Sequence, residues 1–393
     1  MAKPKLALIP ATQGSKLYSV LPADGVGDFN FSRGSAATRI NKEGLIETVA
    51  SGVSRLNYPL IDGVVNGCPS HLLEPSRSNL VTYSEDFSNA YWSKSGSSVT
   101  SGFISPNGTA NAFKLTKTGS GNSLVRLVSG LTNVLYTNSF YIKRVSGSGN
   151  VSLILPNGTG EVVDIDNEWK RYSVTSLPSG GTGAFTGLIL SQTNDEVLIY
   201  GAQLEQGGYA TSYIPTSGSS VTRVAETANG AGDASTFNDS EGVLMVEISA
   251  LANDGRIALN NGTTSRNVRF VYNANANRID GIVYNGANQF SSNYVLPTQG
   301  SFNKISLKYK PSDFALWVNG FKVGSLVGSG TTFTEGTLSE LDFDAGSNGL
   351  IPFYGKTKQI QYFDSALNDS DLETLTSWVS FTDLANGQLY SII

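Results

Sequence analysis

Apolar residues alternate with polar residues in many short runs along the chain, and this period of two predicts β-strands. The clearest runs are NKISLKY at residues 303–309 and, after a KPSD turn, FALWV at residues 314–318. Asn319-Gly320 comes next, a dipeptide that favours the positive φ angles of a type I′ turn. The pattern therefore predicts a β-hairpin whose second strand begins directly after Gly320.

The alternation also assigns the two faces of this hairpin. Phe314, Leu316 and Val318 share one face of the strand, and Trp317 lies on the other. We expect the first three side chains to fill a core. Trp317 then faces solvent or a partner, unless a neighbouring strand, loop or subunit covers it.

Similar runs recur through most of the chain, which favours an all-β fold. Turn residues separate the runs at intervals of about 8–12 residues, as in antiparallel β-sandwiches. One short C-terminal helix is predicted at residues 368–378, with Asn368 or Ser370 as its N-cap. Further strands are predicted at residues 112–116, 135–144, 151–155, 169–176, 186–191, 196–205, 243–248, 267–272, 280–284 and 356–363.

Two breaks rich in turn residues, at 68–80 and 212–236, divide the chain. They predict an N-terminal extended segment at residues 1–75, a first sandwich at 76–222 and a second sandwich at 223–393. The second break holds few large apolar side chains, so we expect few contacts to cross it. The second sandwich is then expected to fold alone.

Composition narrows the classes of partner. The 393 residues include 27 Lys and Arg against 32 Asp and Glu, which gives a net charge of −5. Surfaces that bind nucleic acid or anionic lipid need clustered Lys and Arg, so neither partner is expected. No apolar stretch approaches the ~18–20 residues of a membrane span, and the opening apolar run is too short for a secretion signal. We therefore expect synthesis in a reducing cytosol and no membrane partner.

The chain has few residues that could bind a metal ion or activate a nucleophile. Cys68 and His71 form a C-x-x-H pair, but the chain has one Cys and one His, and zinc needs three or four protein ligands. His71 is also the one imidazole available to a catalytic serine, and no G-x-S-x-G elbow surrounds a serine. We expect no metal, no cofactor and no nucleophilic triad.

Paired carboxylates are the remaining route to catalysis. Asp164, Asp166 and Glu168 in VVDIDNEW would share one face of an extended segment. Glycoside hydrolysis needs two carboxylates roughly 5–10 Å apart, and hard oxygen ligands at this spacing also suit calcium. The third interpretation, a solvated loop before Trp169, is the one we favour. We therefore expect that the protein is not an enzyme.

Aromatic side chains are the candidate sugar platforms, because an apolar ring face stacks on the C–H face of a pyranose. Trp317 and Tyr91 are the two carbohydrate-binding candidates. Trp92, next to Tyr91, is expected in a core. The alternative for Trp317 is burial, since a large aromatic side chain is more often buried than exposed.

Three long passages resemble one family. FNFSRGSAATRINKEGLIETV, followed by CPSHLLEPSRSNLVTYSEDFSNAYWSKSG, resembles the N-terminal half of bacteriophage virion proteins known as head fibres, tail fibres or appendage proteins. GAQLEQGGYATSYIPTSGSSVTR resembles the last strand and exit linker of the carbohydrate-binding-module-like jelly roll in those proteins. NKISLKYKPSDFALWVNGFKVG, with FYGKTKQIQYFDSALNDSDLETLTSW, resembles the concanavalin A-like, laminin G-type sandwich that often follows.

The resemblance implies a structural protein of the virion, made in the cytoplasm of a bacterial host. Its partners would be capsid or tail proteins, and its sandwiches would present lectin-like surfaces to host glycans. Two alternatives stay open. One is a glycan depolymerase of a phage appendage, and the other is a purely architectural capsid decoration without a ligand.

The resemblance also implies that residues 1–75 serve virion docking or trimerisation. This segment holds too few core residues to fold alone, so it must pair with another chain or pack on the first sandwich. Arg33 and Arg39, in FSRGSAATR, are the candidate docking residues. The alternative is a strand that completes the neighbouring sandwich. The expected assembly is a homotrimer.

Overall fold

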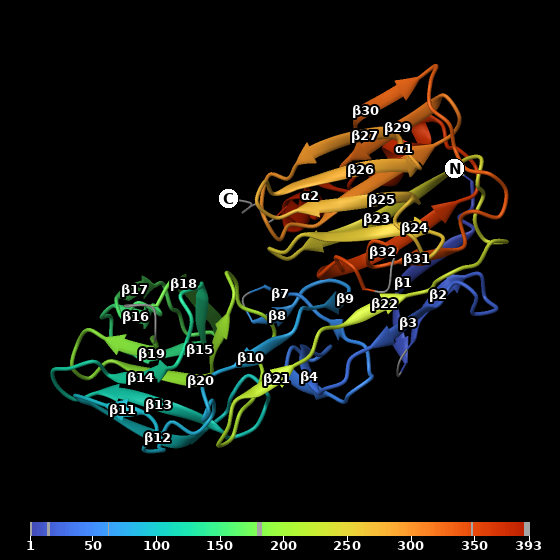
Figure 1. The fold of residues 1–393 in the computed structure, drawn as a ribbon. Coiled ribbons are helices and arrows are strands. Elements are labelled where there is room, and N and C mark those ends of the chain that lie inside the picture. The colour runs from blue at the N-terminus through green and yellow to red at the C-terminus, as the bar shows by residue number, and fades with distance from the viewer. Residues whose placement is uncertain (1, 14–15, 62, 179–182, 347–348, 389–393) are drawn as a thin grey trace.

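The computed structural model describes residues 2–13, 16–61, 63–178, 183–346 and 349–388. Two β-sandwiches make up most of the molecule. The one that comes first in the sequence contains β11 to β20 (Figure 1). The fold class is all-β, as the alternating runs predict. No described helix is long and apolar enough to cross a membrane.

The first sandwich consists of two five-stranded antiparallel sheets. Phe87, Trp92 and Phe140 pack together in the core between them. The burial of Trp92 matches its expected place. One sheet contains, in spatial order, β11 (Ser93–Lys94), β14 (Leu124–Ser129), β19 (Gly183–Leu190), β16 (Val151–Ile154) and β17 (Gly160–Val163). The other contains β12 (Ser97–Phe103), β13 (Ala112–Lys117), β20 (Glu196–Gln206), β15 (Tyr136–Ser146) and β18 (Lys170–Ser176).

The second sandwich packs a five-stranded sheet against an eleven-stranded one. The smaller sheet contains β27 (Asn288–Val295), β26 (Arg278–Asn285), β25 (Arg266–Asn273), β24 (Gly255–Asn260) and β31 (Glu340–Asp342). The C-terminal strands of the larger sheet are β32 (Gly355–Phe363), β23 (Gly242–Ala250), β28 (Asn303–Tyr309), β29 (Asp313–Val318) and β30 (Phe321–Val327).

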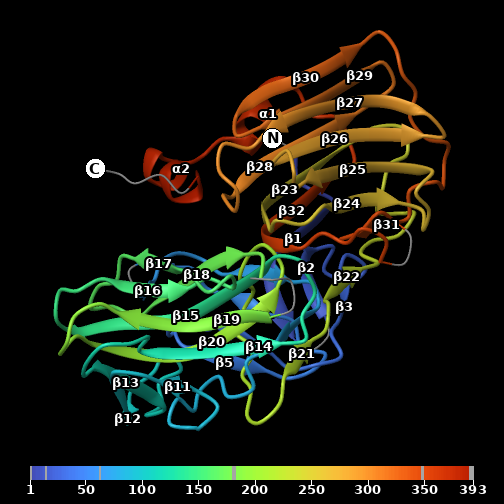
Figure 2. The same ribbon diagram turned by 60° about the vertical axis from the view of Figure 1, so that its left-hand side comes forward.

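The N-terminal strands extend this larger sheet. Strand β1 (Leu6–Gln13) pairs antiparallel with β32, and the sheet continues through β2, β3 and β22. Leu6, Leu8, Phe29 and Phe31 lie in the core of the second sandwich. Figure 2 shows these strands beneath the second sandwich, on the side that faces the first. The other strands of this part are β2 (Lys16–Leu21), β3 (Phe29–Ser32), β22 (Thr227–Asn229), β9 (Ser70–Leu73), which also pairs with β32, and β6 (Leu56–Asn57).

A second part of the N-terminal region packs on the first sandwich. Strands β4 (Ala37–Ile40) and β5 (Ile46–Val49) form a hairpin, and Ile46 is buried against Tyr200 and Tyr213. The segment at residues 1–75 therefore contacts both sandwiches. Two short pairs complete the junction: β7 (Leu60–Ile61) with β8 (Val64–Val65), and β10 (Arg77–Asn79) with β21 (Val221–Arg223).

The expected domain limits do not follow this pairing. The boundary after residue 222 falls inside β21, and β22 in the crossing at 212–236 pairs with β3. The second sandwich takes core residues from the N-terminal strands, so the expectation that it is complete by itself is wrong. The low number of apolar residues predicts few contacts across this segment, but its contacts come from buried charged residues that include Arg223 and Glu226.

The hairpin and the helix agree with the sequence. Asn319 and Gly320 have φ angles of 52° and 87°, as a type I′ turn requires. Helix α1 (Asp369–Thr376) is capped by Asn368, whose side chain accepts a hydrogen bond from the Asp371 backbone N–H at 2.9 Å. Helix α2 (Phe381–Gln388) was not predicted.

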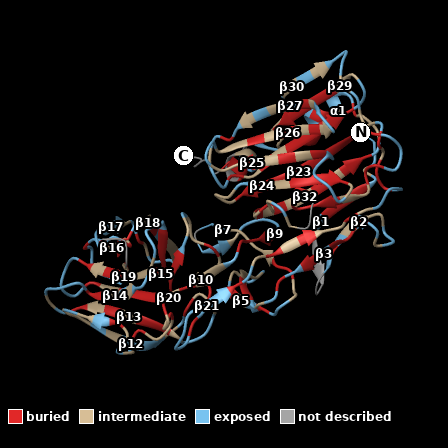
Figure 3. Ribbon diagram, viewed as in Figure 1, coloured by how far each residue is buried: buried red, intermediate tan, exposed pale blue. Residues whose placement is uncertain are grey.

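Strand β23 is buried along its whole length (Figure 3). Leu244 and Val246 point into the core between the sheets. Val243 and Met245 point the other way, where Leu372 and Leu375 of α1 lie in the same cluster. The helix therefore gives this sheet a second covered face.

The burial pattern of β29 gives a stability prediction. Leu316→Ala should lower the free energy of unfolding by about 2–5 kcal/mol, because Leu316 is fully buried and its removal leaves a cavity. Val327→Ala is the control, since Val327 is 76% exposed and should change stability by less than about 0.5 kcal/mol. Urea unfolding of the full chain measures both. Equal losses would contradict the assignment of Leu316 to the core.

Candidate functional site

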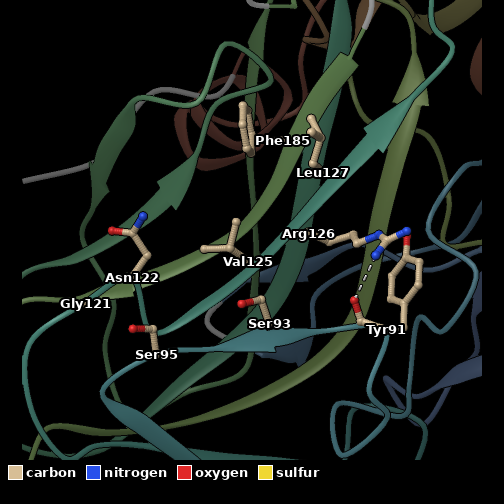
Figure 4. A pocket seen from close by; sticks show the side chains of 9 residues that line it. All are labelled: Tyr91, Ser93, Ser95, Gly121, Asn122, Val125, Arg126, Leu127 and Phe185. Carbon is tan, nitrogen blue, oxygen red and sulfur yellow. Dashed lines mark hydrogen bonds between the residues drawn. The ribbon is translucent and has the colours of Figure 1, made fainter.

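A groove of about 680 Å³ crosses the outer face of the first sandwich, on the sheet that contains β11, β14 and β19. Its lining mixes apolar, hydroxyl, amide and guanidinium groups, and none of these residues is a carboxylate. Figure 4 shows the lining residues, which are Tyr91, Ser93, Ser95, Gly121, Asn122, Val125, Arg126, Leu127 and Phe185.

The strand register places apolar side chains on the groove floor. Leu127 on β14 lies directly opposite Phe185 on β19, and Val125 lies opposite Gly187. Leu127 is 46% exposed, which is unusual for a large apolar residue in the middle of a sheet. Gly187 has no side chain, and a Cβ at this position would lie 2.0 Å from the Leu124 carbonyl oxygen, so β14 and β19 approach each other closely here. This floor suits the apolar face of a ring-shaped ligand.

The rim of the groove carries a cation over an aromatic ring. The Arg126 guanidinium lies 4.2 Å from the centre of the Tyr91 ring, within cation–π range. Arg126 Nη1 also donates a long hydrogen bond of 3.4 Å to the Tyr91 carbonyl oxygen (Figure 4). Tyr91 therefore lines the groove, Arg126 covers part of its ring, and its role in carbohydrate binding stays a prediction. The free apolar surface belongs to Leu127 and Phe185.

One feature of the sequence could have identified the groove residues that were not predicted. In LVRLVS, at residues 124–129, Leu124 and Val128 point into the core. Val125 and Leu127 must then lie on the outer face, so this strand is apolar on both sides. A strand of an antiparallel sandwich normally turns polar side chains to solvent, and this strand departs from that pattern.

Trp317 is not exposed, and the expectation of a solvent-facing platform is wrong. The predicted faces are correct, because Phe314, Leu316 and Val318 lie in the core of the second sandwich and Trp317 lies on the opposite face. Trp317 is only 6% exposed, because α1 covers that face with Leu372 and Leu375. The sequence predicted the helix but not where it packs.

Arg33 is buried and therefore unavailable for the docking contact expected of it. It belongs to an ion-pair cluster at the junction, the arginine–glutamate cluster, formed by Arg33, Arg55, Glu74, Arg223 and Glu226. Arg33 Nη1 lies 2.7 Å from Glu226 Oε1, and Arg55 Nε donates to the same oxygen at 2.8 Å. Glu74 Oε2 lies 2.9 Å from Arg55 Nη2 and 3.0 Å from Arg223 Nη1.

Backbone groups complete the cluster. The Glu74 backbone N–H donates to Glu226 Oε2 at 2.8 Å, and the Ser212 backbone N–H donates to Glu74 Oε1 at 2.8 Å. Burial alone would raise the pKa of the Glu74 carboxyl, but Arg223 and Arg55 hold that pKa well below its usual range. Glu74 therefore stays ionised over the whole physiological range.

Arg39 has a different environment from Arg33. It lies on the β4–β5 hairpin, where Arg39 Nε donates to Glu47 Oε2 at 2.9 Å across the two strands. The side chains are 26% and 43% exposed, respectively. Its role in docking stays a prediction.

Cys68 and His71 do not act together. Cys68 is exposed, whereas His71 is buried between Phe31 and Phe343, with ring centres 6.0 and 6.3 Å away. Neither ring nitrogen of His71 has a hydrogen-bond partner in the described structure. Burial, with a smaller contribution from Arg55, lowers the pKa of His71 to about 3.

The acidic triplet before Trp169 does not lie on an extended strand. Residues 164–168 form an irregular loop, and Asp166 Oδ2 lies 2.6 Å from Lys170 Nζ. Hydrogen bonds from Lys170 and from the Glu168 backbone lower the pKa of Asp166, so this carboxyl is unsuited to donating a proton. Within the described ranges, no group of three or more His, Cys, Asp and Glu side chains could hold a metal ion.

Comparisons with known proteins give distant structural similarities. No protein-family model and no curated protein matches the chain. The carbohydrate-binding module CBM40 of the Ruminococcus gnavus IT-sialidase, bound to α2,3-sialyllactose, shows 16% identity over 37% of this chain and 86% of its own, with a TM-score of 0.33. The leech intramolecular trans-sialidase shows 18% identity over 37% of this chain and 24% of its own, with a TM-score of 0.32. A SAP-like pentraxin from Limulus polyphemus shows 14% identity over 36% of this chain and 76% of its own, with a TM-score of 0.27.

Breaking the arginine–glutamate cluster should be costly. Arg55→Met should lower the free energy of unfolding by about 3–5 kcal/mol, because it leaves two buried carboxylates short of a partner. Arg39→Met is the matched control, since it removes a partly exposed pair and should cost at most about 1 kcal/mol. Chemical denaturation compares the two variants. A similar loss in both would mean that the cluster adds nothing beyond a surface ion pair.

His71 should make the protein less stable in acid. Its folded pKa lies below the ordinary value of 6.5, so between pH 6.5 and about 3 the unfolded state binds the extra proton. From pH 7.5 to pH 5, the wild type should therefore lose about 2 kcal/mol more stability than His71→Leu. Asp342 acts in the opposite direction, because burial raises its pKa to about 6, but its effect is common to both proteins. Parallel pH dependences of the two would show that His71 does not titrate in this way.

Proposed function

We propose that this protein is a non-catalytic structural component of a bacteriophage particle that binds host-surface glycans through the groove on its first sandwich. The observation that carries the binding proposal is the apolar floor of Val125, Leu127 and Phe185, of which Leu127 is exposed, bordered by hydroxyl, amide and guanidinium groups. A sugar ring offers C–H faces to such a floor and hydroxyl groups to such a border.

The chemistry of the groove favours binding over cleavage. Glycosidic bond cleavage by the usual route needs two carboxyl groups. The groove lining holds none, and Asp166 lies on a loop outside it, paired with Lys170. A depolymerase function therefore receives no support from this site.

The role in a virion rests on the three sequence passages that resemble phage head and tail fibres. Two features of the structure are compatible with a role in a virion. Both sandwiches have long antiparallel sheets, and the described N-terminal strands pair within the chain. Electron microscopy of particles carrying a labelled copy would locate the protein on the capsid or the tail.

Assembly as a homotrimer is part of this proposal. The N-terminal segment was expected to need another chain, and its described strands instead pair with β32 and pack on the first sandwich. Surfaces that remain available include Arg39 and the exposed side chains of Ile61 and Val64. Light scattering of purified protein gives the number of chains directly.

The groove proposal predicts a specific loss of glycan binding. On a glycan array, the full-length protein should bind a subset of bacterial surface glycans, and Phe185→Ala should weaken that binding about tenfold, or ~1.4 kcal/mol. Val295→Ala removes an exposed apolar residue from the second sandwich and should bind as the wild type does. The same glycans should not be shortened during incubation.

Two outcomes would contradict the groove proposal. The first is an array without any bound glycan, which would favour the purely architectural decoration. The second is unchanged binding by Phe185→Ala, which would place the glycan elsewhere on the protein.

A further inference from the structure

A second pocket, of about 230 Å³, lies where three parts of the chain meet. The β4–β5 hairpin contributes Thr38, the first sandwich contributes Tyr141 and Arg171, and the second sandwich contributes Leu251 and Lys356. These first-sandwich residues belong to β15 and β18, which form the opposite sheet from the one that carries the groove. The junction pocket is therefore separate from the proposed glycan groove.

The surroundings of the junction pocket carry an excess of positive charge. Glu74 lines the pocket and belongs to the arginine–glutamate cluster, which has three guanidinium groups and two carboxylates. Arg171 and Lys356 add two further cations, and neither forms an ion pair with a carboxylate of the described residues. This excess is notable in a chain whose net charge is −5.

Lys356 is the cation with the least compensation. It lies on β32, between Leu72 of β9 and Ser249 of β23, and its side chain is only partly exposed. Burial lowers its pKa, and the neighbouring Lys358 adds to this, while Glu74 opposes it. A partly desolvated ammonium group without a direct ion pair is unfavourable, and an anion in the pocket would reduce that cost.

Arg171 offers the second half of an anion site. Its guanidinium donates to the Thr211 carbonyl oxygen and, at 2.9 Å, to Ser139 Oγ. Its Nε atom is buried and has no hydrogen-bond partner. The guanidinium also lies 5.4 Å from the centre of the Tyr141 ring, which fixes its orientation at the pocket wall.

We infer that the junction pocket binds the oxyanion of a small ligand, most suitably the carboxylate of an acidic sugar, between Lys356 and Arg171. A neighbouring cavity of about 430 Å³ shares the walls Ile40, Ile46 and Tyr141 with the junction pocket. That cavity is lined by Trp169 and Phe103, so it offers apolar surface to a sugar ring whose carboxylate lies in the junction pocket. A free inorganic anion shares the oxyanion chemistry but would not use the apolar cavity.

Thermal unfolding of the full-length protein tests this site. The probes are inorganic phosphate, sodium glucuronate and a galacturonate trisaccharide, each added at constant ionic strength set with KCl. We expect a saturable rise in Tm, because a ligand that binds only the folded state stabilises it. A rise with the two sugar acids alone assigns an acidic sugar, and a rise with phosphate as well assigns any small oxyanion.

Two lysines on one strand give a matched pair of variants. Lys356→Met should weaken the binding of the effective probe at least tenfold. Lys358→Met should leave it within twofold, because Lys358 Nζ lies 3.6 Å from Glu247 Oε1 and 4.3 Å from the centre of the Phe302 ring, outside the pocket. Phe185→Ala should also leave it unchanged, which separates this test from that of the glycan groove.

A measurement on the wild type removes any dependence on how the variants fold. Acetylation of lysines, followed by mass spectrometry, should show slower modification of Lys356 when the effective probe is present, with Lys358 as the internal reference. The inference is overturned if no probe gives a saturable rise in Tm. It is also overturned if Lys356→Met binds as the wild type does, or if the probe leaves the modification of Lys356 unchanged.

Discussion

Buried charge at the junction of the two sandwiches constrains the rest of the molecule. An ionised group removed from water needs partners of opposite charge in good geometry, or the fold loses several kcal/mol. The arginine–glutamate cluster takes those partners from two distant stretches of sequence. Arg33, Arg55 and Glu74 precede the first sandwich, and Arg223 and Glu226 follow it. The first sandwich is therefore an insertion whose entry and exit are held together by ion pairs.

This arrangement accounts for the pairing of the N-terminal strands within the chain. Once Arg33 and Arg55 are fixed against Glu226, β3 lies next to β22, and β1 is in place to pair with β32. The apolar residues of these strands lie in the core of the second sandwich. The same geometry leaves both sheets of the first sandwich with a distinct outer surface. One sheet carries the apolar groove, and the other faces the junction.

The sequence was informative where a structure depends on neighbours in the chain. The hairpin at Asn319-Gly320, the N-cap Asn368 and most strands of the two sandwiches follow from local patterns. Three features depend on distant partners and could not be read locally. Trp317 is buried because α1 packs over it, the crossing at 212–236 is ordered by ion pairs, and β1 finds its partner more than 300 residues away. Of the residues that line the groove, the sequence analysis named Tyr91 as a candidate. Leu127 and Phe185 could be identified only from the register of β14 and β19.

The arginine–glutamate cluster has more positive than negative groups, and this excess of positive charge lies between the two sandwiches. Three guanidinium groups share two carboxylates, and Lys356 and Arg171 lie close by without a carboxylate partner. Salt screens such buried groups far less than it screens surface charges, so the excess persists at physiological ionic strength. The excess exists only when both sandwiches and the N-terminal segment that holds Arg33 and Arg55 are assembled, since each contributes part of it. By linkage, any anion that occupies this junction stabilises the assembled arrangement and not the separated parts. A purely apolar interface would lack this link between anion binding and the association of the two sandwiches.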